Sequence, residues 1–183
     1  MQPLRRLGAV LEEFAGPDRA VFAAADLRSA VPEVSDAAFT VLLSRAAASG
    51  VLERVCRGVY LYPRAGLAPG LVLAHAAARL RAGHLLYMSL ESALSEHGVL
   101  SQLPLDRLTL MTSGRRGVIA CGRWGSIEFT HTTRTPSDCR GRLVYDGARR
   151  LWLADPELAW SDLKRVGRNL DLVDPAALGR LHD

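Results

Sequence analysis

The chain has 183 residues, of which 49% are hydrophobic and 23% are charged, and its formal net charge is +4. This length suits one large domain or two small ones, and the apolar content is sufficient for a packed core. No uncharged apolar run reaches the roughly 18 residues of a transmembrane helix, and Glu12 and Glu13 interrupt the first apolar run too early for a signal peptide. We therefore expect a cytoplasmic protein with no membrane segment.

The cysteines and the charge pattern narrow the function further. Cys56, Cys121 and Cys139 form an odd set without C-x-x-C spacing, which predicts neither a disulfide framework nor a zinc site. Residues 107–150 hold nine basic and three acidic residues, an excess of six positive charges. All basic residues except Lys164 are arginine, whose planar fork suits phosphate, although a GC-rich genome would supply arginine without selection. No cofactor is expected.

The first 66 residues predict a winged helix-turn-helix domain. Apolar residues at helical spacing indicate a first helix from Leu4 to Phe14, which Gly16-Pro17 ends. The expected elements that follow are a short strand at 21–23, a brief helix at 25–30, a third helix capped by Ser35 or Asp36 and running to Ser49, and two strands at 51–55 and 59–62. Such a domain places its second motif helix in the major groove of DNA.

The third helix has one apolar and one polar face. Phe39, Leu42, Leu43 and Ala46 form a stripe that should face the core. On the opposite face, Arg45 can bond a guanine edge and Val41 can pack on thymine methyl groups. The candidate DNA contacts are Ser35, Thr40, Val41, Ser44 and Arg45 on this helix and Arg54, Arg57 and Arg64 around the hairpin. This reading surface is thin, so specificity would need a dimer on DNA, DNA shape or a second contact region.

Residues 67–183 predict a second domain, a mixed α/β domain with a mainly antiparallel sheet, so that the whole chain is of the α+β class. The expected helices cover 71–81, 89–97, 156–168 and 174–181, and the expected strands cover 85–88, 108–112, 118–121, 126–130, 143–145 and 151–153. Ser89 is expected to cap its helix, and Gly98 to end it. Ser113–Gly117, with Arg115 and Arg116 between glycines, is expected to be a basic hairpin tip and a further contact to DNA phosphates.

The stretch from Tyr87 to Thr112 resembles the signature of the AbiEi-like antitoxins of bacterial type IV toxin–antitoxin systems. The matching positions are Tyr87, Ser89, Ser92, Ala93, Leu94, His97 and Gly98, with further similarity at Arg57, Gly58 and Tyr60 and over residues 153–166. Most of these residues have the character of packing residues. The sequence departs from many relatives in its shorter helical tail.

The resemblance implies a transcriptional repressor that binds inverted repeats upstream of its own operon through the winged helix. It also implies an antitoxin domain, a role in abortive infection and phage defence, and a nucleotidyltransferase-like toxin encoded nearby. In that family the antitoxin often opposes the toxin without a stable complex, so direct contact with the toxin is left open. The alternative is a winged-helix adaptor that docks on a protein, including the toxin, without binding DNA.

Enzymatic interpretations find little support in the sequence. Ser89 or Ser92 with His97 could suggest a nucleophile and base, but no G-x-S-x-G motif surrounds either serine. Asp162 and Lys164 are the candidate pair for a nuclease, yet they lie on an expected helix without a second well-placed carboxylate. Neither phosphate-binding glycine motif occurs. We expect a protein that is not an enzyme and holds no metal.

Overall fold

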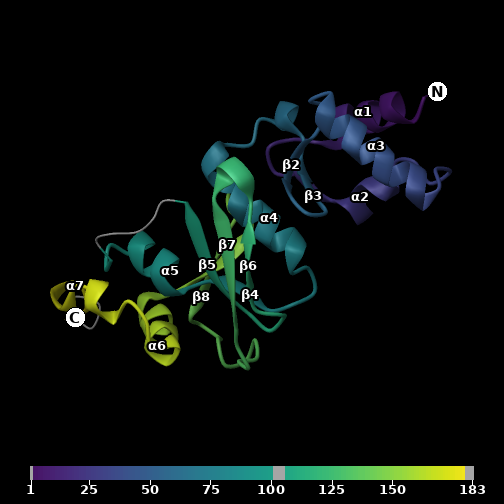
Figure 1. The fold of residues 1–183 in the computed structure, drawn as a ribbon. Helices are drawn as coiled ribbons and strands as arrows, with labels where there is room; N and C mark the ends of the chain where they lie inside the picture. Colours follow the sequence, from purple (N-terminus) through teal and green to yellow (C-terminus); the bar gives the residue numbers. More distant parts are fainter. Residues whose placement is uncertain (1, 101–105, 180–183) are drawn as a thin grey trace. The chain divides into compact units, whose positions relative to one another are not determined.

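The computed structural model describes residues 2–100 and 106–179 (Figure 1). The chain divides into two compact units, Met1–Leu80 and Arg81–Asp183, and the predicted α+β class is confirmed. A helix is expected at 174–181, and the part of it that follows Gly179 lies outside the described residues. No helix in the described ranges is long and apolar enough to cross a bilayer.

The first unit combines helices with a small sheet, as a winged helix does. Its helices are α1 (Pro3–Phe14), α2 (Ala24–Arg28), α3 (Asp36–Ala48) and α4 (Val72–Leu80), and its strands are β1 (Val21–Ala23), β2 (Glu53–Cys56) and β3 (Val59–Leu61). The strands pair antiparallel in the order β1-β3-β2. Leu7, Leu11, Leu27 and Leu43 are all buried in its core. This confirms the predicted order of elements.

Helix α3 has the cap and the buried stripe that its sequence predicts. Ser35 is the N-cap, and its hydroxyl accepts a bond from the Ala38 backbone N–H at 3.4 Å. Gly50 takes the left-handed conformation just after the helix, at φ 74°. The four residues expected in the core are all buried: Phe39, Leu42, Leu43 and Ala46. The other face of α3 is therefore turned outward.

Helix α4 belongs to the first unit, so the division after Leu80 differs from the expected one after residue 66. The helix buries Val72 and Ala76, and its Arg79 donates to the Val21 carbonyl at 3.2 Å. Arg79 also forms an ion pair with Asp26 at 3.6 Å. Gly66, Pro69 and Gly70 are residues typical of a linker, but they lie in a connection within the unit because α4 packs back onto β1.

The second unit is built on a six-stranded mixed sheet in the order β6-β7-β5-β4-β9-β8. Its strands are β4 (Leu86–Met88), β5 (Arg107–Thr112), β6 (Gly117–Ala120), β7 (Ser126–His131), β8 (Leu143–Asp146) and β9 (Leu151–Ala154), and its helices are α5 (Leu90–Glu96), α6 (Pro156–Val166) and α7 (Pro175–Gly179). Three of the five neighbouring pairs are antiparallel and two are parallel, namely β4 with β9 and β5 with β7.

Helices α5 and α6 pack together beside this sheet (Figure 1). Their shared core holds Tyr87, Leu94, Met111 and Leu163, each at most 1% exposed. Asp155 caps α6 by accepting from the Leu158 N–H at 2.7 Å, with Pro156 at the first helical position as predicted. The signature stretch thus supplies one strand and one helix of this core.

The segment Ser113–Arg116 is not a hairpin tip, contrary to the sequence prediction. Strands β5 and β6 are not neighbours, because β7 lies between them, parallel to β5 and antiparallel to β6. The segment therefore crosses the end of β7, where the His131 ring bonds the Gly114 carbonyl at 3.0 Å. Two consecutive strands with a short glycine-flanked connection favour a hairpin. Here β5 and β6 cannot pair with each other, because β7, which comes later in the chain, lies between them.

Candidate nucleic-acid interface

The predicted DNA-reading residues on the outward face of α3 differ in whether their polar groups already have hydrogen-bond partners within the protein. Val41 is 48% exposed, and Ser44 and Arg45 are also exposed. The Thr40 hydroxyl, in contrast, donates to the Asp36 carbonyl of its own helix at 3.1 Å. The Ser35 hydroxyl is occupied by the cap. Arg45 is therefore the long, charged donor on this face, with Ser44 and Val41 beside it.

Arg28, which the sequence does not mark as functional, fastens the N-terminal end of α3. Its guanidinium lies 5.0 Å from the centre of the Phe39 ring and 3.4 Å from the Asp36 carboxylate. It also donates to the Val31 carbonyl at 3.0 Å. These contacts connect α2, the following loop and α3. They join residues up to 11 positions apart, which no local pattern reveals.

The predicted wing is the antiparallel β2–β3 hairpin. Gly58 adopts a positive φ of 76° at its turn, and Arg57 beside it is exposed. Arg54 donates from Nε to the Cys56 carbonyl at 3.4 Å and so lies along the hairpin. Arg64 lies beyond β3 and pairs with Glu12 of α1 at 3.2 Å. Both partners are well exposed, so this pair costs little to open when another anion competes.

The basic excess of residues 107–150 is partly neutralised within the second unit. At least four of its nine arginines form ion pairs with carboxylates, three of them with residues outside the segment. The pairs are Arg107–Glu128 at 3.5 Å, Arg134–Asp162 at 3.3 Å, Arg142–Asp155 at 2.6 Å, Arg149–Asp146 at 2.5 Å and Arg149–Glu96 at 2.7 Å. The sequence excess therefore overstates the free positive charge.

Arg115 and Arg116 keep their charge at the surface. They line a shallow hollow with His84, Ser113 and His131. The Arg81 guanidinium donates to the Arg115 carbonyl at 2.8 and 3.2 Å and stacks 4.0 Å over the Phe129 ring. Burial and the nearby Arg115 charge lower the pKa of Arg81. The backbone of this basic connection is thus fixed while its two side chains are exposed.

The signature serines and histidine have structural partners. Ser89 is the N-cap residue of α5 but makes no capping bond; its hydroxyl instead donates to Asp162 at 2.9 Å, which corrects the expected cap. The Ser92 hydroxyl accepts from the Thr109 backbone N–H at 2.9 Å. The His97 ring bonds the Ala154 carbonyl at 2.9 Å. These bonds join α5 to β5, β9 and α6.

Asp162, the carboxylate considered above for a nuclease, is the centre of a buried polar cluster. It is fully buried and accepts from the Tyr87 hydroxyl at 3.0 Å as well as from Ser89. Arg134 and Arg165 each lie 3.3 Å from its other oxygen. Burial, followed by the Asp162 charge and hydrogen bond, raises the pKa of the Tyr87 phenol. This cluster joins β4 and α6 to the loop after β7.

A second cluster holds the segment after α6. Arg168 donates to Glu91 at 2.9 Å and also to Glu128, and Asn169 donates to Glu91 at 2.8 Å. Both carboxylates belong to buried residues. Burial would raise the pKa of Glu91, but hydrogen bonds from Arg168, its own backbone and Asn169, with the Arg168 charge, lower it overall. The sequence does not reveal this cluster, because its members lie as much as 78 residues apart.

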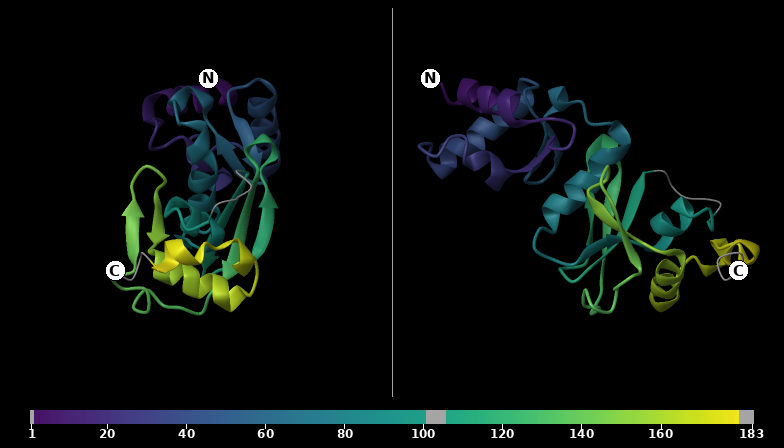
Figure 2. Two further views of the ribbon diagram at one scale, coloured as in Figure 1. Left: turned by 90° about the vertical axis from the view of Figure 1, so that its left-hand side faces the viewer. Right: turned by 180° about the vertical axis from the view of Figure 1, so that it is seen from behind.

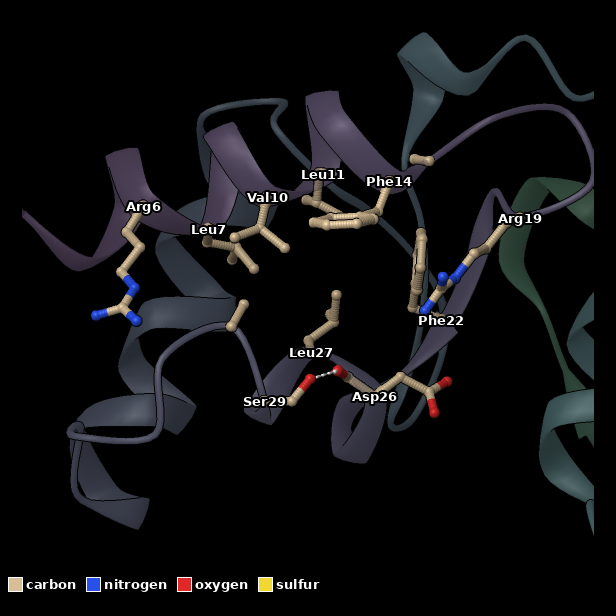
Figure 3. A pocket seen from close by; sticks show the side chains of 12 residues that line it. Arg6, Leu7, Val10, Leu11, Phe14, Arg19, Phe22, Asp26, Leu27 and Ser29 are labelled. Atoms are coloured by element: carbon tan, nitrogen blue, oxygen red, sulfur yellow. Dashed lines mark hydrogen bonds between the residues drawn. The ribbon is translucent and has the colours of Figure 1, made fainter.

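A hollow of about 400 Å³ lies between α1 and the β1–α2 region (Figure 3). Leu7, Val10 and Phe14 approach it from α1, and Leu27 approaches it from α2. Arg6, Arg19 and Asp26 stand at its rim (Figure 3). Phe14 lines the hollow and is still 57% exposed. The hollow is mainly apolar with a charged rim.

Residues 20–63 match the family model described as "Transcriptional regulator, AbiEi antitoxin". The match runs from β1 through α3 to the end of the wing, and it is to the family that the sequence resemblance named. No curated protein matches the chain.

A solved structure shares the fold. The RV2827C protein from Mycobacterium tuberculosis is similar with a TM-score of 0.55 at 16% sequence identity. The alignment covers 87% of this chain and 59% of that one, so this chain spans well under two thirds of its solved relative. At this identity the likeness concerns the fold, and it extends beyond the regulator domain into the second unit.

Proposed function

We propose that this protein is a cytoplasmic, DNA-binding transcriptional repressor that serves as the antitoxin of a type IV toxin–antitoxin system. The observation that carries the proposal is the exposed face of α3 with Arg45, followed by the arginine-bearing wing, inside the segment that matches the regulator family. The operator is an inverted repeat upstream of its own operon. The role is non-enzymatic and belongs to abortive infection of phage-infected cells.

The proposed contacts follow from the chemistry of each side chain. Arg45 donates two bonds to a guanine edge in the major groove, and Val41 packs on a thymine methyl group. Arg57, at the exposed turn of the wing, meets phosphate or enters the minor groove. Arg115 and Arg116 supply a further phosphate contact that carries no sequence information. Arg54 and Arg64 have intramolecular partners and contribute less.

The second unit is proposed to support the antitoxin activity against a nucleotidyltransferase-like toxin encoded nearby. Its clusters around Asp162 and Arg168 fix the signature stretch in place. The signature residues Tyr87, Ser89 and His97 are therefore assigned to stability and not to toxin contact, which leaves the outer surface of the unit for any encounter with the toxin.

The test is binding of the purified protein to DNA from upstream of its own gene. Fluorescence anisotropy is measured with the native fragment and a scrambled fragment, at about 50 and 200 mM salt. We expect tighter binding to the native fragment and weaker binding of both at high salt. Equal affinity for both fragments, or no binding, would reject the repressor while leaving the fold untouched.

A second candidate function, a protein-docking adaptor that binds the toxin directly, is favoured by the apolar hollow under α1 and the exposed Phe14 (Figure 3). Phe14→Lys and Arg45→Ala separate the two functions. An adaptor loses co-purification with the neighbouring gene product on Phe14→Lys and is indifferent to Arg45→Ala. A repressor shows the reverse in the DNA-binding assay.

A further inference from the structure

Strand β8 is an open edge of the six-stranded sheet (Figure 2). Exposed edges invite pairing with another chain, and proteins usually guard them with charged residues. The opposite edge strand, β6, has one large exposed apolar residue, Val118 at 61% exposure. Strand β8 has two, Val144 at 68% exposure and Tyr145 at 50%, and it ends at Asp146. The β8 edge therefore exposes more apolar surface than the β6 edge.

The hydrogen bonds between β8 and β9 show which backbone groups of β8 point away from β9. The Arg142 carbonyl accepts from the Asp155 N–H at 2.8 Å, so Arg142 and Asp155 form a hydrogen-bonded pair of this antiparallel ladder. Bonded and non-bonded pairs alternate along an antiparallel ladder. Leu143 and Tyr145 therefore direct their N–H and C=O groups away from β9. Within residues 2–100 and 106–179, no strand pairs with them there.

The residue order of this edge is complementary to itself. The segment reads Arg142-Leu143-Val144-Tyr145-Asp146, with opposite charges at its ends and apolar residues between. If two copies run antiparallel with a twofold axis at Val144, Leu143 lies opposite the partner's Tyr145 and can exchange two N–H···O bonds with it. Symmetry doubles this to four bonds. The same register sets Arg142 opposite the partner's Asp146.

We propose that β8 is a dimerisation edge whose occupant is β8 of a second copy of this chain. Slipping the register by one residue loses the outward donors and acceptors, and slipping it by two separates Arg142 from the partner's Asp146. Trp152 of β9, 45% exposed and edge-on to Tyr145 at 5.2 Å, widens the apolar surface on that face. A second copy of the chain would bond the outward backbone groups, cover the exposed apolar side chains and place opposite charges across the interface.

The dimer should be weak, because the charged residues of this edge already have ion-pair partners within their own chain and the edge is short. Arg142 is paired with Asp155 at 2.6 Å and Asp146 with Arg149 at 2.5 Å, so the charges across the axis mainly select the register. A four-residue edge provides much less than the roughly 1,600 Å² of a standard stable interface. The dimer is therefore concentration-dependent. The inference does not depend on DNA binding.

Cysteine crosslinking at the axis tests the geometry. In an antiparallel non-bonded pair the Cα atoms lie about 4.5 Å apart, within the range of a disulfide. Val144→Cys should therefore form a covalent dimer under mild oxidation. Val118→Cys on β6, at a valine 61% exposed, is the matched control. Cys56, Cys121 and Cys139 are buried and do not compete.

We expect Val144→Cys to crosslink at least about tenfold faster than Val118→Cys, because pairing raises the local thiol concentration. Equal rates in the two variants would indicate random collision and overturn the proposal. Failure of the folded Val144→Cys variant to crosslink would overturn it as well.

Sedimentation velocity over a concentration series tests the association itself. The wild-type chain should shift from monomer to dimer as its concentration rises. Val144→Lys places like charges on the axis and Tyr145→Pro removes an outward donor, so both should remain monomeric, whereas Val118→Lys should dimerise like the wild type. A wild-type monomer at every concentration would overturn the proposal and leave this edge to a strand from another protein.

Discussion

The two units differ in whether their functional arginines are paired with carboxylates. In the first unit, Arg45 and Arg57 stand exposed on α3 and the wing, and no carboxylate among the described residues pairs with them. In the second unit, Arg107, Arg134, Arg142 and Arg149 of the basic segment are bound to carboxylates. Arg134 and, outside the segment, Arg168 reach buried carboxylates. The basic excess of residues 107–150 thus includes fewer free charges for DNA than the sequence suggests.

The comparison teaches that formal charge along a sequence does not locate a nucleic-acid surface. A buried carboxylate with its arginines contributes structure, and removing one partner leaves an uncompensated charge. An exposed arginine without a partner contributes little to stability and remains available to phosphate or base edges. The distinction predicts opposite phenotypes for arginine or carboxylate substitutions in the two units.

The largest effect is expected for Asp162→Ala. The substitution removes the carboxylate that accepts hydrogen bonds from Tyr87 and Ser89, and it leaves Arg134 without its ion-pair partner. The free energy of unfolding of the second unit should therefore fall by about 3–5 kcal/mol. Urea unfolding followed by tryptophan fluorescence measures this unit, because all three tryptophans lie in it: Trp124, Trp152 and Trp160.

The control for Asp162→Ala is Asp171→Ala, which removes an exposed carboxylate from the same unit. The control should change stability by less than about 0.5 kcal/mol. If both variants lost the same small amount, the second unit would not depend on charge pairing, and the contrast between the units would collapse.

The next largest effect is expected for Arg168→Met, about 3 kcal/mol at neutral pH, with a change in pH dependence. In the wild type the pKa of Glu91 is lowered in the folded state, so its contribution is present above its unfolded pKa, near 4.3, and is lost as the pH falls further. Without Arg168, we expect the pKa of Glu91 to rise, because burial opposes ionisation and only the backbone and Asn169 hydrogen bonds remain to lower the pKa. The variant should then gain stability relative to the wild type as the pH falls from 7 to about 5.

Urea midpoints of Arg168→Met and wild type across this pH range provide the measurement. Arg168→Lys keeps a positive charge near Glu91 and Glu128 and is expected to keep the wild-type sign. A parallel pH profile for Arg168→Met and wild type would show that Arg168 does not hold these carboxylates ionised.

Local signals made the first unit predictable. The apolar stripe of α3, its Ser35 cap and the Gly50 stop are all encoded within about 15 residues, and each appears in the structure as expected. The candidate reading residues followed because an amphipathic helix with a known buried face has a known exposed one. What the sequence did not reveal was that Thr40 bonds its own helix and that Arg28 fixes α3.

Long-range pairing made the second unit harder to predict. The bonds from Tyr87 and Ser89 to Asp162 span more than 70 residues, and a serine before a helix favours the local capping interpretation. The connection at Arg115 was misassigned for a similar reason, because β7 enters between β5 and β6 only later in the chain. Patterns of hydropathy identified the strands but could not order them.

A smaller effect, confined to DNA, is expected for Arg45→Ala. Loss of a bidentate contact to a base should weaken binding to the native operator by about 10- to 100-fold and leave the scrambled fragment nearly unchanged. Stability should change little, because Arg45 is exposed. Arg64→Ala is the comparison, since Arg64 already pairs with Glu12, and it should weaken both fragments slightly and equally. Equal losses on both fragments for Arg45→Ala would place this arginine on phosphate.

The smallest effect is expected for the double variant Arg115→Gln/Arg116→Gln, and it bears directly on the contrast between the units. These two arginines keep their charges exposed side by side, so they should contact phosphate without regard to sequence. The dependence of log affinity on log salt should flatten by up to about 2, roughly 0.9 for each lost contact. Arg140→Gln, which removes an exposed charge from the same segment, should leave the slope unchanged. An unaltered slope in the double variant would confine DNA binding to the first unit, and the second unit's charge would then serve its own stability alone.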